Sequence, residues 1–192
     1  MTTNETLTLL ANRRSLKPTM FAEQGPTNQE LEQILTIAAR VPDHKKLNPW
    51  RFIDFAGEAR GQAGELFAKA CLAEDKQAPS EIRLNTERER FLRAPVVVAV
   101  ISRSVQKPGV PEIEQILSTG AAAFNLCLAA NALGYGTCWI TEWIAYSPTV
   151  REGLGLAEGE RIAGFVYIGR AAERQEDRPR PELQNIVSYW KG

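Results

Sequence analysis

The chain has 192 residues, a length that favours one domain with a full hydrophobic core over two domains. Its 23 basic and 23 acidic residues cancel, so the charge balance gives no support for a nucleic acid or an anionic membrane as a partner. Hydrophobic residues make up 44% of the chain, which is typical of an ordinary globular protein. We therefore expect a single domain over residues 1–192, in which any anion is bound by local groups.

The cysteines and the apolar segments indicate a soluble protein of the cytoplasm. The chain has three cysteines and no Cys-x-x-Cys pair, which predicts buried, reduced thiols. Its first residues lack the basic and then apolar pattern of a signal peptide. The longest apolar stretch, 121–133, contains two asparagines and is shorter than the roughly 20 residues that cross a bilayer.

Two helices are predicted near the N-terminus, because apolar side chains recur there at helical spacing. The first spans 5–13, with Asn4 as a candidate N-terminal cap. The second spans 27–40 and begins with Thr27 and Glu30 in a capping-box pattern.

The loop from Arg40 to Trp50 joins the second helix to a strand and carries two lysines and the only histidine, His44. Its first proline ends the helix by disfavouring helical backbone at the preceding residue. Asn48-Pro49 then turns the chain into an apolar strand. Loops held by packed elements often carry binding groups, so this loop is a candidate anion-binding segment. A solvated basic loop with His44 at the surface remains the alternative.

The rest of the chain is predicted to mix strands and helices. The charged, helical segment 58–93 is expected to cover the core and to carry little chemistry. The unbroken β-branched run 96–101 predicts a strand buried on both faces. The helix predicted at 111–133 is apolar on every side from Gly120 onward, which implies full burial in the fold or against a second subunit. The remaining predictions are strands at 137–141 and 162–168 and a helix at 147–153.

The C-terminal tail, 170–192, is polar and contains prolines, but it ends in the largely apolar sequence IVSYW. A disordered tail rarely ends in such residues. We expect the tail to dock on its own subunit or on a neighbour.

Arg13, Arg14 and Ser15 at the end of the first helix match the donors that a terminal phosphate requires. Each hydrogen bond to a charged group contributes roughly 1.5 to 3 kcal/mol. A solvated helix end favoured by the helix dipole is the more ordinary interpretation of two adjacent arginines. The arginine pair alone therefore does not decide between the two.

Other kinds of site have less support. The sequence has no dinucleotide-binding glycine motif after a strand, no P-loop and no Gly-x-Ser-x-Gly. One histidine without a cysteine cluster argues against a structural zinc site. A hydrolase that pairs His44 with Cys138 is a weaker alternative, because nothing in the sequence brings these residues together.

Three segments, taken together and in this order, resemble the nitroreductase family of FMN-dependent oxidoreductases. They are Arg13-Arg14-Ser15, the loop from Pro42 to Trp50, and the stretch from Gly120 to Trp139. The resemblance covers nearly the whole chain. The Pro-Asp-His-Lys form of the loop is similar to the small YdjA-like branch of the family.

This resemblance implies an α+β fold, arranged as a three-layer α/β/α sandwich around a central mixed, mainly antiparallel sheet. It also implies a domain-swapped homodimer with one FMN at each end of the interface, in contact with both subunits. The long apolar helix would form the dimer core, and the tail 170–192 would dock on the partner subunit.

The resemblance also assigns cofactor-binding residues by position. Arg13, Arg14 and Ser15 would hold the phosphate and the pyrimidine edge of the flavin. Arg40 and His44 would bind FMN from one subunit. The family at large often has serine, asparagine and glutamine in the loop, so this chain departs from the usual contacts there.

The other subunit would contribute Trp139, Ile140 and Thr141. Ile140 stands where a close relative has arginine, and Arg178 or Arg180 is a candidate replacement. No catalytic protein group and no metal site are expected, because the flavin carries the chemistry.

The implied activity is the reduction of a small-molecule acceptor by NADH or NADPH. Hydride would pass from NAD(P)H to FMN and then to a nitroaromatic, quinone or related acceptor at the same face, in ping-pong order. A non-catalytic flavin-binding or flavin-storage protein on the same scaffold is the alternative.

Overall fold

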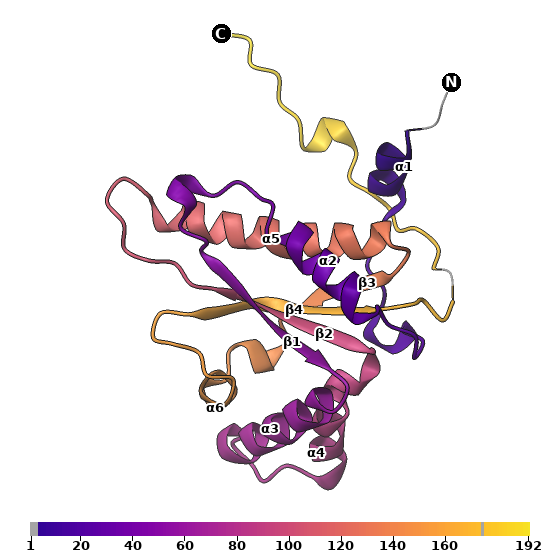
Figure 1. Cartoon of the computed structure of the whole chain (residues 1–192), viewed down its shortest axis with the longest axis vertical. Coiled ribbons are helices and arrows are strands. Elements are labelled where there is room, and N and C mark those ends of the chain that lie inside the picture. The colour runs from indigo at the N-terminus through magenta and orange to yellow at the C-terminus, as the bar shows by residue number, and fades with distance from the viewer. Residues whose placement is uncertain (1–3, 174) are drawn as a thin grey trace.

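The computed structural model describes residues 4–173 and 175–192, and it places a four-stranded sheet between two layers of helices (Figure 1). The strand order is β1-β2-β4-β3, and all three strand pairs are antiparallel. Among the described residues, the parallel component expected of a mixed sheet is limited to an isolated bridge between Ser15 and Thr137. The strands are β1 Trp50–Ala56, β2 Val96–Ser102, β3 Gly136–Ile140 and β4 Arg161–Gly169.

The helices cover both faces of the sheet, which confirms the predicted α+β fold with three layers (Figure 1). On one face, α2 packs beside the long helix α5, and α1 contacts α5. The other face carries α3, α4 and α6. The helices are α1 Glu5–Asn12, α2 Asn28–Ala38, α3 Ala59–Glu74, α4 Glu81–Arg88, α5 Glu112–Ala132 and α6 Pro148–Gly153; short 3₁₀ turns occupy Pro18–Met20, His44–Lys46, Arg90–Arg93, Trp143–Ala145 and Leu183–Asn185.

Strand β2 lies between two cores, as its β-branched sequence predicts. All seven of its residues are buried. Alternate side chains point to opposite faces of a strand, so Val97 and Ile101 join the core under α3 and α6. Val98 and Val100 join the core under α2 and α5.

The predicted helix starts are confirmed by their caps. The Asn4 side chain accepts a hydrogen bond of 3.2 Å from the backbone of Leu7. Both bonds of the capping box are present, from Thr27 N to Glu30 Oε2 at 2.8 Å and from Glu30 N to Thr27 Oγ1 at 3.2 Å. These bonds satisfy backbone donors that the first turn of a helix leaves free.

Helix α5 is only half buried, so the prediction of full burial within one subunit is not met. Ala122, Ala123 and Leu126 are completely buried against the sheet. Leu117 and Phe124 are 65% and 41% exposed on another side of the helix. By length and composition alone α5 is apolar enough to cross a membrane, although half of its 18-residue apolar window is buried inside the fold.

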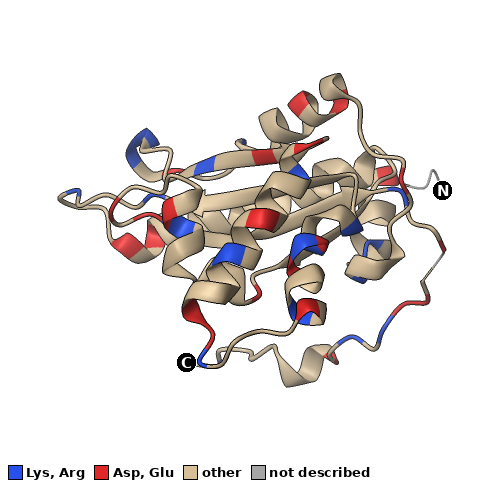
Figure 2. Cartoon of the chain, turned by 90° about the horizontal axis from the view of Figure 1, so that it is seen from below, with Lys and Arg blue, Asp and Glu red and all other residues tan. Residues whose placement is uncertain are grey.

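The tail after β4 runs away from the sheet toward the side of α1 (Figure 1). The start of the tail docks on its own subunit, through an antiparallel bridge between Phe21 and Ala171 and a hydrogen bond of 2.9 Å from Ala172 N to the Met20 carbonyl. The apolar side chains near its end are exposed, so the predicted docking of that end is not observed within one subunit. Figure 2 shows lysine, arginine and acidic residues interspersed along the chain, in keeping with the zero net charge. The exposed apolar side chains of the tail are Leu183, Ile186, Val187, Tyr189 and Trp190.

The close contact between the backbones of α3 and α4 leads to a prediction about stability. A methyl group at Gly64 would lie 2.1 Å from the carbonyl oxygen of Arg88, so the two backbones must separate to admit it. We expect Gly64→Ala to lower the free energy of unfolding by roughly 1 to 3 kcal/mol in a urea titration, the usual cost of overpacking.

Gly61 is the matched control, because it lies on the same helix with nothing within 4 Å of an added methyl group. Gly61→Ala is expected to raise stability by about 0.4 to 1 kcal/mol through the lower entropy of the unfolded chain. Equal stability of the two variants would contradict the close approach of α3 and α4.

Candidate functional site

Arg13, Arg14 and Ser15 follow α1 and lie beside the edge strand β3. Ser15 forms the parallel bridge with Thr137, and Leu16 N donates a hydrogen bond of 2.8 Å to the Thr137 carbonyl. The structure thus brings the N-terminal arginine pair to the strand that carries the predicted residues 139–141. These two segments are far apart in the sequence, so no local pattern predicted that they lie side by side.

The Arg13 side chain has an unsatisfied donor in a partly buried setting. Its guanidinium carbon lies 5.5 Å from the centre of the Phe124 ring. Its Nε atom is buried and has no hydrogen-bond partner among the described residues. Buried donors are normally paired, and an unpaired one costs about 1 to 3 kcal/mol. A bound anion at the accessible end of this guanidinium would balance its charge.

The tail brings further arginine to the same region. Arg180 Nη2 lies 2.7 Å from Asp177 Oδ1. The backbone N–H of Arg178, the Arg180 hydrogen bond and the charge of Arg14 hold the pKa of Asp177 below its usual value. Asp177 is therefore within electrostatic reach of both Arg14 and Arg180. The role of Arg180 as a replacement for the arginine missing at position 140 stays a prediction.

Trp139, Ile140 and Thr141 line one cavity of about 470 Å³ with Ala163 and Glu142. The Trp139 indole crosses strand β4 and donates from Nε1 to the Ala163 carbonyl at 3.2 Å. Gly164 permits this crossing, because a Cβ atom there would lie 2.2 Å from Trp139 Nε1. The predicted wall residues therefore share an open cavity at the sheet edge.

Arg40 and His44 lie along α5, and neither lines that cavity. His44 is exposed, and its Nδ1 lies 2.6 Å from Glu114 Oε2 in the first turn of the helix. Asn125 donates to the Arg40 carbonyl at 3.3 Å. Ten residues of helix separate Glu114 from Phe124, about 15 Å at 1.5 Å per residue. His44 is thus separated along α5 from the arginine pair in one subunit, whereas the Arg40 backbone lies at Asn125, one residue from the Phe124 that packs on Arg13.

The loop around His44 has an unusual backbone. Lys45, Lys46 and Asn48 have φ values of 61°, 54° and 48°, in the left-handed region that side chains disfavour. Both carboxylate oxygens of Asp43 hold the loop, accepting from Leu47 N at 3.0 Å and Asn48 N at 2.8 Å. The loop is therefore an ordered turn with its basic side chains outside.

The sequence interpretation missed Glu142. Its φ of 55° and ψ of 179° fall in a region that is essentially restricted to glycine. Its carboxylate forms an ion pair with Arg90, lies 3.8 Å from Arg93 and accepts a hydrogen bond of 3.4 Å from the Tyr167 hydroxyl. The sequence offered one signal for Glu142, its position directly after the predicted site residues 139–141.

A second acidic residue, Glu87, joins the same charge network. It is completely buried and accepts hydrogen bonds from Arg90 at 2.5 and 2.6 Å and from Trp143 Nε1 at 3.2 Å. Arg83 also donates to it and packs over the Trp143 ring. Segment 58–93, expected to carry little chemistry, therefore holds a buried ion pair next to the cavity wall.

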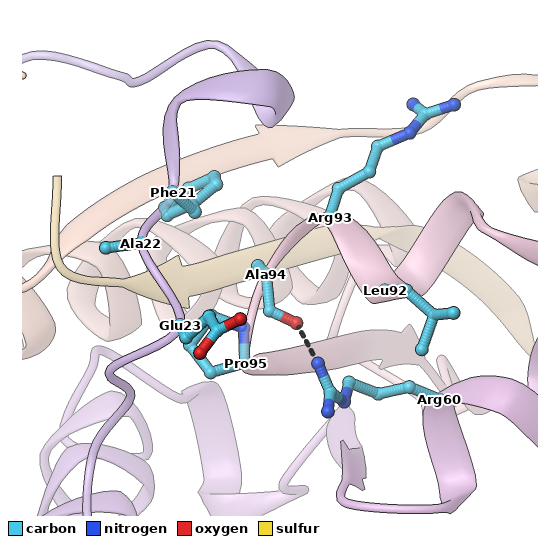
Figure 3. Close-up of a pocket in the computed structure, with 8 residues that line it drawn as sticks. All are labelled: Phe21, Ala22, Glu23, Arg60, Leu92, Arg93, Ala94 and Pro95. Atoms are coloured by element: carbon cyan, nitrogen blue, oxygen red, sulfur yellow. Dashed lines mark hydrogen bonds between the residues drawn. The ribbon is translucent and has the colours of Figure 1, made fainter. Parts of the chain in front are cut away.

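The cavity in Figure 3 lies between the segment that follows the 3₁₀ turn Pro18–Met20 and the start of β2, and has a volume of about 430 Å³. It contains none of the predicted site residues. Its Arg60 donates to the backbone carbonyls of Gly57 at 3.2 Å and Ala94 at 2.8 Å, so this side chain holds the fold together.

The pairing of Cys138 with His44 is not formed. Cys138 is 5% exposed in the core under α3 and α6, and burial raises the pKa of its thiol to about 11. His44 lies on the other side of the sheet against α5. The prediction of free, buried thiols is confirmed for Cys71, Cys127 and Cys138.

The fold and site define an α+β protein with an arginine cluster and an open cavity at one sheet edge. The sequence model of the nitroreductase family matches residues 10–170. The chain therefore belongs to the nitroreductase family and is an oxidoreductase. This family assignment agrees with the resemblance found in the sequence.

Relatives and solved structures agree with the assignment. The chain is 34% identical over 165 residues to an Escherichia coli K12 protein provisionally named NAD(P)H nitroreductase YdjA, covering 86% of this chain and 87% of that protein. A Haemophilus influenzae relative, provisionally named an NAD(P)H nitroreductase, is 33% identical over 189 residues, 96% of this chain and 99% of the relative.

A nitroreductase-like protein from Bacillus cereus matches with a TM-score of 0.84 at 24% identity, covering 100% and 99% of the two chains. A nitroreductase with bound FMN from Bacteroides fragilis matches with a TM-score of 0.71 at 22% identity, covering 98% and 100%. At these identities the two structures support the fold.

Proposed function

We propose that the protein is an FMN-dependent oxidoreductase that uses NADH or NADPH to reduce small-molecule acceptors such as nitroaromatics or quinones. The observation that carries this proposal is the Arg13 guanidinium, which has no ion-pair partner among the described residues and lies beside Arg14 at the sheet edge that also holds the Trp139 cavity. The names of the relatives and the FMN bound to the Bacteroides fragilis structure support the same choice.

The described residues fit FMN. Arg13, Arg14 and the Ser15 hydroxyl would bind the phosphate, with Arg180 close by. Trp139 to Thr141 would line the flavin ring, since they surround about 470 Å³ of open space. When bound, FMN accepts a hydride from NAD(P)H and passes the reducing equivalents to an acceptor in ping-pong order. The protein binds and orients the reactants, and basic side chains stabilise negative charge that develops at the site.

A homodimer would complete this site, with Arg40 and His44 contributed by the partner subunit. Two exposed apolar surfaces support the association of a second copy of the chain. The open side of α5 exposes Ile113, Leu117 and Phe124, and α1 beside it exposes Leu7. Exposed apolar side chains gathered on adjacent elements mark interaction surfaces.

The C-terminal tail would reach the partner in this dimer. β1 is an edge strand of the sheet, and the groove between it and α2 is lined by Leu31, Leu35 and Phe52. An extended segment can add to an open sheet edge by backbone hydrogen bonds while its side chains fill an adjacent groove. The apolar end of the tail, 186–190, is suited to this position.

We also assign the protein to the cytoplasm, without nucleic-acid or membrane partners. The balanced charge and the three free, buried cysteines support this assignment.

Anaerobic reduction tests the enzymatic role. Protein saturated with FMN should lose the absorbance of oxidised flavin when NADH or NADPH is added without oxygen, and should regain it when a nitroaromatic or quinone follows. Free FMN at the same concentration, with the same nicotinamide, is the control for direct reduction in solution. Bound flavin that stays oxidised with both nicotinamides would instead support the non-catalytic flavin-binding alternative.

A further inference from the structure

Glu142 adopts a backbone conformation that a residue with a side chain rarely holds. It directly follows Thr141 and lines the same cavity as Trp139. Its φ and ψ of 55° and 179° are strained for glutamate, although glycine adopts them freely. Such strain persists only where the surroundings over-determine the conformation, and it is concentrated at functional sites.

The surroundings of Glu142 do over-determine it. Arg90, 5% exposed, binds the Glu142 carboxylate and is held from its other side by the fully buried Glu87. The next residue, Trp143, is tied to the same Glu87 through its indole N–H. Two consecutive residues at the end of the cavity wall are thus anchored to one buried carboxylate in α4.

Stability alone is a weak explanation for this network. The desolvation of buried charges largely offsets their attraction, and well-packed apolar side chains are often as stable. What a buried, fully paired network provides is a fixed geometry. Here the geometry is that of residues 139–142, which line the cavity where the chain runs out of strand β3.

We propose that Glu142 is a positioning residue of the flavin site: its carboxylate, clamped by Arg90, keeps a glycine-like backbone at position 142 and so sets the cavity wall for the ligand. This inference rests on the proposed function, because the ligand of the wall is taken to be FMN. The ion pair with Arg90 thus holds Glu142 in a backbone conformation that glycine would adopt without any side-chain contact.

Two variants separate the backbone effect from the loss of charge. Glu142→Ala and Glu142→Gly remove the same carboxylate and leave Arg90 with the same remaining partners, but only glycine adopts the observed backbone without strain. We expect the dissociation constant of FMN, from quenching of flavin fluorescence, to rise about tenfold or more in Glu142→Ala. In Glu142→Gly it should stay within about threefold of the unchanged protein, because relief of strain restores the wall.

The unfolding of the flavin-free variants in urea is measured in parallel. A purely structural role lowers stability but leaves the dissociation constant of the folded protein unchanged, which would overturn the proposal. Equal FMN affinity in the alanine and glycine variants would overturn it too. If Glu142→Ala does not fold, Glu142→Gln replaces it, since glutamine keeps the side-chain length without the charge and should bind FMN more weakly than glycine.

The proposed function and the role of Glu142 are contradicted by different results. If the unchanged protein itself does not bind FMN, the flavin assignment is wrong. If the unchanged protein binds FMN and only the difference between alanine and glycine is missing, the flavin site stands and the role of Glu142 falls.

Discussion

Removal of residues 183–192 is expected to yield a monomer that no longer retains FMN. The deleted segment carries Ile186, Tyr189 and Trp190, which are 63%, 83% and 92% exposed in one subunit and would be covered by its partner. Without the dimer, Arg40 and His44 of the second subunit leave the site. We expect the dissociation constant of FMN to rise roughly a hundredfold or more, since several hydrogen bonds to a charged ligand are lost together.

Light scattering after size-exclusion chromatography measures the assembly, and flavin fluorescence measures binding. A chain that lacks only residues 191–192 is the control, because it keeps the apolar run 186–190; both shortened chains keep Arg180. If the longer deletion still gives a dimer with bound FMN, the tail does not hold the subunits together.

Arg13→Ala is expected to weaken FMN binding by about 10- to 150-fold, the equivalent of one hydrogen bond to a charged group at roughly 1.5 to 3 kcal/mol. Its guanidinium has no ion-pair partner among the described residues, so the phosphate would accept from the accessible end of this group. The same change at Arg14 should have a smaller effect, because the nearby Asp177 carboxylate already offsets part of the Arg14 charge. Fluorescence titration and thermal melting together separate loss of binding from unfolding.

Lys17→Ala is the matched control for this series. Lys17 is exposed and lies four residues after Arg13, so its removal changes the net charge equally without removing the buried donor. Equal FMN affinity of the Arg13 and Lys17 variants would mean that the phosphate is bound elsewhere.

Much of the fold is predictable because its signals are local. The capping box at Thr27 and Glu30 fixes the start of α2 with two short hydrogen bonds. The run of valines in β2 allows burial on both faces, which a central strand requires. Hydrophobic period and caps depend on neighbours a few residues away, so they can be interpreted without the tertiary structure.

The remaining parts of the candidate site depend on contacts across the fold. Arg13 reaches β3 through pairing between Ser15 and Thr137, which no local pattern encodes. Glu87 and Arg90 have the composition of a solvated helix surface, and they are buried by contacts across the fold, such as the packing of α4 on α3 and the hydrogen bond from Trp143 to Glu87. The positive φ of Glu142 could not be predicted either, because glutamate has no preference for that backbone region.

The exposed side of α5 could not be predicted for a different reason. From Gly120 onward the helix is apolar all round, and a sequence cannot tell which side faces the sheet of its own subunit and which faces another surface. The structure assigns Ala122 and Leu126 to the sheet and leaves Phe124 open.

The burial of all three cysteines has a chemical consequence for an enzyme of this class. Quinones and the products of nitro reduction are electrophiles that react with thiolates, and the thiolate is the reactive form of cysteine. Burial raises the pKa of Cys71, Cys127 and Cys138 to about 11, so only about one thiol in ten thousand is ionised near pH 7. The three cysteines of this protein are therefore expected to resist alkylation by such electrophiles.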